Sequence, residues 1–111
     1  MTVGFELDGQ AFTALNGGPM YRFTEAVSFV VHCETQAEVD HYWDKLTADG
    51  REVQCGWLKD KFGLSWQVVP VALFELIQQK DPQKASRVMG ALMQMTKLDV
   101  EGLRKAAAGA A

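Results

Sequence analysis

The segment from Thr35 to Gly50 constrains the fold of this chain most, because it carries a helix start signal followed by a single apolar stripe. Thr35 is followed three residues later by Glu38, the spacing of a capping box, in which each side chain accepts a hydrogen bond from a backbone N–H near the first turn. Apolar residues then recur with helical spacing, at Val39, Tyr42, Trp43 and Leu46. The segment therefore predicts an amphipathic helix that lies on a sheet, ended by Gly50 in the left-handed conformation.

Strand-forming runs lie on both sides of this helix. Residues 27–33 alternate between two faces, as a half-buried strand does. Residues 52–57 and 64–69 carry further strand signals, and Pro70 stops the last of them because it cannot donate to a β-ladder. We therefore predict an α+β chain in which residues 27–69 form a strand–helix–strand–strand–strand unit.

A hairpin signal stands near the start of the chain. Asp8-Gly9 separates two runs of six residues, 2–7 and 10–15, and the first run places Val3, Phe5 and Leu7 on one face. Asp-Gly between two such runs is the strongest short signal for a β-hairpin. We therefore predict that residues 2–15 form a hairpin.

Helix start signals organise the C-terminal part. Asp81 followed by Pro82 has the pattern of an N-cap and a first helical residue. Asp99 is expected to cap a last short helix. Residues 71–108 are therefore predicted to be helical, outside the strand–helix–strand–strand–strand unit.

Size and charge bound the class of protein. The chain has 111 residues, which predicts a single domain over residues 1–111. Its net charge is −3 and it has no Lys/Arg cluster, so neither a nucleic acid nor an anionic membrane surface is an expected partner. No apolar run reaches the roughly 20 residues of a membrane span, and the N-terminus lacks a signal-peptide pattern. The two cysteines, Cys33 and Cys55, are expected to be reduced thiols in a cytoplasmic protein.

Several segments together resemble one protein family, namely residues 5–19, 28–35, 54–60 and 65–70 with the Asp81-Pro82 helix start. They are similar to the PhnB-like branch of the vicinal oxygen chelate superfamily, which includes glyoxalase I, bleomycin-resistance proteins and extradiol dioxygenases. The branch carries the label of a 3-demethylubiquinone-9 3-methyltransferase domain. The resemblance implies a glyoxalase-like fold, in which two βαβββ modules form a curved, open barrel around a site. Residues 27–69 correspond to one complete module. Residues 2–15 correspond only to the final hairpin of the other, so the first module is expected to be incomplete.

The resemblance also implies where a metal would bind. Metal-binding members place His or Glu ligands on the inward faces of the strands. On this mapping Thr13 and Gln67 stand where a Glu would, and Ser28 stands where a His would. Because Ser and Thr are poor ligands for such metals, we predict neither a metal nor another cofactor at this site. The same groups can form hydrogen bonds with an uncharged polar ligand.

Three further residues are weaker candidates. His32 shares a strand face with Ser28, and could act as a base or stray ligand, although a half-exposed structural role is favoured. Trp57 and Trp66 are expected to pack in the sheet, with an aromatic wall for a planar ligand as the alternative. A methyltransferase would need a nucleotide-type site for its methyl donor, and no motif of that kind is present.

Three functional hypotheses remain open at this point, so the sequence does not decide whether the protein is an enzyme. The first is a binding protein without a catalytic metal, for a small molecule held by Thr13, Ser28, His32, Trp57, Trp66 and Gln67. The second is a metal-dependent lyase, isomerase or dioxygenase of the vicinal oxygen chelate type. The third is a domain without a ligand. A homodimer is expected in each case, because six strands are too few to close the cavity and an open sheet edge is normally covered.

Overall fold

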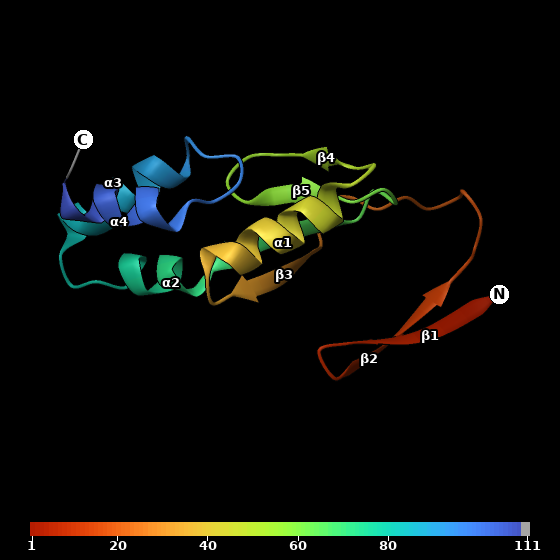
Figure 1. Ribbon diagram of the computed structural model, residues 1–111. Helices are drawn as coiled ribbons and strands as arrows, with labels where there is room; N and C mark the ends of the chain where they lie inside the picture. The colour runs from red at the N-terminus through yellow and green to blue at the C-terminus, as the bar shows by residue number, and fades with distance from the viewer. Residues whose placement is uncertain (110–111) are drawn as a thin grey trace.

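The computed structural model describes residues 1–109, which contain two β-sheets and four α-helices (Figure 1). The prediction of an α+β chain is therefore confirmed. In chain order the elements are β1 (Thr2–Leu7), β2 (Gln10–Leu15), β3 (Ser28–Cys33), α1 (Gln36–Thr47), β4 (Arg51–Glu52), β5 (Trp57–Lys59), β6 (Ser65–Pro70), α2 (Val71–Ile77), α3 (Pro82–Leu92) and α4 (Val100–Ala108).

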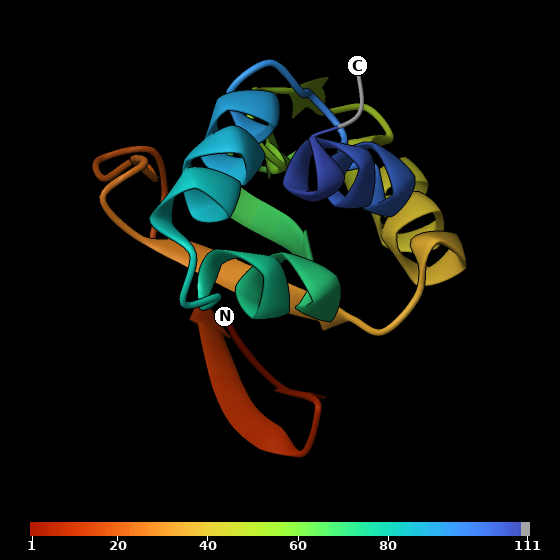
Figure 2. The same ribbon diagram turned by 90° about the vertical axis from the view of Figure 1, so that its left-hand side faces the viewer.

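The first sheet is the predicted hairpin, and it stands apart from the rest of the chain (Figure 2). β1 and β2 pair antiparallel from Thr2 opposite Leu15 to Leu7 opposite Gln10. Both turn residues have positive φ, 51° at Asp8 and 78° at Gly9, as a tight two-residue hairpin turn requires. The hairpin meets the second sheet through aromatic rings, because the ring centroids of Phe12 and Phe29 lie 5.6 Å apart.

The second sheet has the strand order β3–β6–β5–β4, with β3 at one edge and β4 at the other. β3 runs parallel to β6, whereas β5 is antiparallel to both β6 and β4. α1 lies across one face of this sheet (Figure 1). The core between helix and sheet consists of buried Cys33, Val39, Trp43, Leu58 and Val68.

The start of α1 is as predicted. The Thr35 side chain accepts a hydrogen bond from the Glu38 N–H at 3.2 Å, and the Glu38 carboxylate accepts one from the Glu34 N–H at 3.3 Å. The predicted end is wrong, because Asp49 rather than Gly50 adopts positive φ, at 59°. Gly50 is needed for a different reason: a Cβ there would collide with the backbone oxygen of Lys59.

The strand predicted over residues 52–57 is wrong in its bounds. A turn divides the segment into β4 and β5, and Cys55 and Gly56 adopt positive φ of 61° and 84° there. The N–H groups of these two residues donate to the carbonyls of Met95 and Thr96, each at 2.8 Å. The backbone of the turn is therefore bound by the loop between α3 and α4, which no local pattern could reveal.

α2, α3 and α4 gather at one end of the second sheet (Figures 1 and 2). The predicted caps are confirmed, since Asp81 accepts from the Gln83 N–H at 2.9 Å and Asp99 from the Glu101 N–H at 3.1 Å. A second core joins these helices to β6, and its buried members are Val69, Leu73, Val88, Leu98, Leu103 and Ala107. Within residues 1–109, no helix has the length and apolar character needed to cross a membrane.

Candidate functional site

The candidate site lies on the face of the second sheet opposite α1, which we call the outer face. Register partners on neighbouring strands point to the same face. Leu58 and Trp66 are partners and contribute to the core against α1. Trp57 and Gln67, one residue along each strand, are also partners and therefore lie on the outer face. Val30, the partner of Gln67 on β3, lies there as well.

A row of polar side chains crosses all four strands of the outer face. Ser28 on β3 pairs with Ser65 on β6, Ser65 with Lys59 on β5, and Lys59 with Arg51 on β4. Gln67 lies one step along β6 from this row, and its amide donates to the Ser28 hydroxyl at 2.9 Å. We call Ser28, Ser65, Lys59 and Arg51 the polar row.

Ser65 is the most unusual member of the polar row. It is only 1% exposed, and its hydroxyl has no hydrogen-bond partner in the described part of the chain. Leaving a buried hydroxyl unpaired costs about 1–3 kcal/mol, so most such groups in native proteins are satisfied. The Ser65 hydroxyl is therefore an unused hydrogen-bonding group on the outer face.

Lys59 forms an ion pair with Glu25, which lies in the loop between β2 and β3. The Lys59 side chain is 21% exposed and that of Glu25 is 61% exposed, so the lysine is the more buried partner of the pair. The hydrogen bond from Lys59 lowers the pKa of the Glu25 carboxyl, and the charge of Arg51 lowers this pKa further. Neither Ser65 nor Lys59 is among the site residues predicted from the sequence. Ser65 stands two residues before Gln67, which is the spacing of strand residues on one face.

Four of the six residues predicted for the site share the outer face. Ser28, Gln67 and Trp57 are half-buried and adjacent across the strands. His32 is exposed at the far end of β3, with its ring centroid 5.4 Å from that of Phe74 on α2. His32 thus packs beside α2, four residues along β3 from Ser28.

The other two predicted residues lie elsewhere. Trp66 is on the α1 face, where its indole N–H donates to the Asp60 carboxylate at 2.9 Å and its ring meets that of Phe29 edge-on. Neighbouring residues of a strand point to opposite faces, so Trp66 lies on the face opposite Gln67. With Ser28 and His32, however, Trp66 lines the groove along the edge of β3. Thr13 is exposed on the hairpin, on the face opposite Phe12, and Phe12 is the residue that contacts Phe29.

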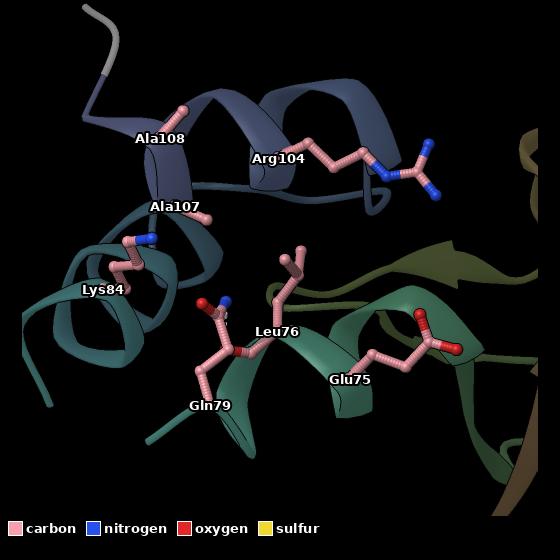
Figure 3. A pocket seen from close by; sticks show the side chains of 7 residues that line it. All are labelled: Glu75, Leu76, Gln79, Lys84, Arg104, Ala107 and Ala108. Carbon is pink, nitrogen blue, oxygen red and sulfur yellow. Dashed lines mark hydrogen bonds between the residues drawn. The ribbon is translucent and has the colours of Figure 1, made fainter. Parts of the chain in front are cut away.

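Three hollows adjoin these elements. A groove of about 750 Å³ follows the free edge of β3 and is closed on one side by the hairpin tip at Leu7 and Asp8. A hollow of about 440 Å³ lies between the loop after β2 and the turn before β6, and Lys59 lines it. The third, of about 420 Å³, lies between α2, α3 and α4 (Figure 3) and contains none of the predicted residues.

Metal-ligating and nucleophilic groups are sparse. Across residues 1–109, no three His, Cys, Asp or Glu side chains lie close enough together to hold a metal ion. Both cysteines are free thiols. Burial, with a smaller effect from Glu38, raises the pKa of the Cys33 thiol to about 11, so Cys33 is a poor nucleophile.

Comparison with known proteins gives a family match, similar solved structures and one negative result. A family model described as 3-demethylubiquinone-9 3-methyltransferase matches residues 1–69. The structure is similar to that of a PhnB protein from Bacillus cereus, described as a candidate 3-demethylubiquinone-9 3-methyltransferase, with 34% sequence identity and a TM-score of 0.59. The match covers 64% of this chain and 64% of the Bacillus cereus chain. The comparison with curated proteins found no match.

Proposed function

We propose that the chain is a glyoxalase-like protein that binds a small molecule on the outer face. The premise is that the chain belongs to the family described as 3-demethylubiquinone-9 3-methyltransferase. The observation that carries this proposal is the hydrogen bond between Gln67 and Ser28 beside the buried, unpartnered hydroxyl of Ser65. These groups lie together on a half-buried sheet face next to Trp57. A ligand with polar and apolar parts would form hydrogen bonds with Gln67, Ser28 and Ser65. Its apolar part would pack on Trp57.

The proposal places the chain in the PhnB-like branch of the vicinal oxygen chelate superfamily. The element order β3–α1–β4–β5–β6 is that of one βαβββ module, which supports this assignment. The hairpin would be the last part of a second module. The family description names a methyl transfer, but the polar row and Gln67 offer no arrangement for a nucleotide-type methyl donor, so binding is the activity that we propose.

We also propose that the protein is a homodimer. β3 is an edge strand with a free side, and the groove of about 750 Å³ runs along it. The apolar face of the hairpin is open as well, with Val3 51% exposed and Phe5 41% exposed. An uncovered strand edge beside an apolar face favours association, and a second chain could cover both.

A thermal-shift screen with small polar compounds, both uncharged and anionic, tests the binding proposal. A compound present at 100 times its Kd stabilises the folded state by about 2.7 kcal/mol. Gln67→Leu should abolish the shift, because it removes the amide and frees Ser28. Gln83→Leu, at an exposed position of α3, is the matched control and should retain it. A shift that survives in Gln67→Leu would contradict the proposed site, and a screen without any stabilising compound would contradict the proposed function.

A further inference from the structure

The polar row ends in two cations that point the same way. Lys59 and Arg51 are register partners on β5 and β4, so both side chains leave the same face of the sheet. That face is fixed by Trp43, whose indole N–H donates from α1 to the Glu52 carboxylate at 2.9 Å. Because Glu52 faces α1, its neighbour Arg51 faces outward. Arg22 adds a third cation, since it lines the same hollow as Lys59.

Only part of this positive charge is neutralised by nearby carboxylates of residues 1–109. Glu25 forms an ion pair with Lys59, and the charge of Arg51 also lowers the pKa of the Glu25 carboxyl. Asp60 lies next to Lys59 in sequence, but its carboxylate accepts hydrogen bonds from the N–H groups of Phe62 and Leu64 and from the Trp66 indole. Three cations thus face one available carboxylate, on a chain whose net charge is −3. A local excess of this sign attracts anions.

The hollow beside these cations has an apolar wall. Its volume is about 440 Å³, and its lining combines Arg22 and Lys59 with the aromatic rings of Tyr21, Phe23 and Phe62. Aromatic walls with a few charged groups are typical of sites for small organic ligands. Ser65, the register partner of Lys59, supplies the buried unpartnered hydroxyl on the same face.

We propose that Lys59 and Arg51 bind the anionic group of a small aromatic acid, either a carboxylate or a phosphate-type group, and that the ligand displaces Glu25 from Lys59. The Glu25 carboxylate then stands in for the ligand anion in the structure described here. The aromatic body packs on Phe23 and Phe62, which line the hollow beside Lys59. This inference rests on the proposed function and adds the class of ligand.

Calorimetric titration of the full chain tests the inference with three probes of one shape: benzoate, phenylphosphonate and the uncharged benzamide. Glu25→Gln removes the competing carboxylate, so the Kd for both anions should fall about five- to tenfold, whereas the Kd for benzamide should not change. Lys59→Met should weaken the binding of both anions at least about tenfold. Added salt should weaken the binding of the two anions and leave the binding of benzamide unchanged. The anion that binds tighter identifies the preferred head group.

Two charge-matched variants serve as controls. Lys80→Met changes an exposed lysine after α2, and Glu101→Gln changes an exposed glutamate of α4. Neither should alter the anion affinities. If Glu25→Gln behaves like Glu101→Gln, or if it tightens benzamide equally, the inference is wrong. Should Lys59→Met fail to fold by circular dichroism, the Glu25→Gln comparison decides alone, because Glu25 is exposed in a loop.

The two proposals fail in different ways. The anion site would be overturned if the anion affinities did not change in the Glu25 and Lys59 variants. The proposed function would still stand if uncharged compounds bound in a way that depends on Gln67. Absence of binding for anions and uncharged compounds alike would overturn both. Anion binding that depends on Lys59 and tightens in Glu25→Gln would support both.

Discussion

Gln67 on β6 donates its side-chain amide to the Ser28 hydroxyl on β3 across 2.9 Å, although the two residues are 39 positions apart in the chain. Both stand where metal-binding relatives would carry a ligand, according to the family resemblance. In this chain the two side chains form a hydrogen bond with each other instead. Neither is anionic or an imidazole, and a catalytic divalent site normally gathers three protein ligands from His, Glu, Asp or Cys.

We therefore predict that the native protein holds no stoichiometric transition metal, and that Ser28→His combined with Gln67→Glu creates metal affinity. The double variant adds an imidazole and a carboxylate at adjacent positions of the outer face. Elemental analysis and zinc titration of both proteins give the measurement, with Gln10→Glu on β2 combined with Ser86→His on α3, two exposed positions on separate elements, as the control pair. About one zinc, nickel, iron or manganese per native chain would contradict this prediction and favour the enzyme hypothesis.

The cap of α1 gives a prediction about stability. Thr35→Ala removes the acceptor of the Glu38 N–H and should lower the free energy of unfolding by about 1 kcal/mol. The measurement is the denaturant midpoint at unchanged m-value. Ser86→Ala, at an exposed position inside α3, should cause no loss of stability. Equal midpoints for native protein and Thr35→Ala would show that the capping bond contributes nothing.

Two glycines should respond to alanine in opposite directions. Gly50→Ala would drive a Cβ into the backbone oxygen of Lys59, so the strand must shift and the free energy of unfolding should fall by about 1–3 kcal/mol. Gly90 lies inside α3 and has open space around it, so Gly90→Ala should raise the free energy of unfolding by about 0.5–1 kcal/mol. Thermal and denaturant unfolding of the two variants gives the comparison. A Gly50→Ala protein as stable as the native one would show that β5 does not approach Gly50 closely.

The buried thiol of Cys33 predicts a loss of stability in alkali. Its pKa is about 11 in the folded protein, against an ordinary value of 9.0. Below pH 9 the thiol is protonated in both states, and its contribution to stability is complete. Between pH 9 and 11 the unfolded thiol ionises first, so the free energy of unfolding should fall as the pH rises. Denaturant midpoints at several pH values should show this decline in Cys55→Ala and a smaller decline in Cys33→Ala. Parallel declines in the two variants would assign the effect to other groups.

The proposed homodimer predicts a mass in solution. Light scattering at micromolar concentration should give twice the chain mass of 12.3 kDa. Phe5→Lys places a charge on the apolar face of the hairpin and should shift the mass towards that of one chain. Glu6→Gln, on the other face of the same strand, should leave the mass unchanged. A single-chain mass for the native protein would overturn the proposal.

The sequence by itself determined the local elements. Thr35 and Glu38 give the start of α1, Asp8-Gly9 gives the hairpin, and Asp81-Pro82 gives the start of α3, because each signal acts between residues close in the chain. Period-two alternation also placed Ser28 and His32 on one strand face. The same rule, applied from Gln67, would have placed Trp66 on the opposite face and added Ser65 to the face of Gln67.

The tertiary structure alone decided how these elements meet. The parallel pairing of β3 with β6 brings Ser28 next to Ser65, and the antiparallel β5 adds Lys59 to the row. The division of the strand predicted over residues 52–57 was also set at a distance, because the loop at residues 95–96 accepts the hydrogen bonds of the turn at Cys55 and Gly56. Register between strands and the competition for backbone donors are set by contacts between segments far apart in the chain. Propensity and periodicity describe each segment alone and carry no information about its neighbours in space.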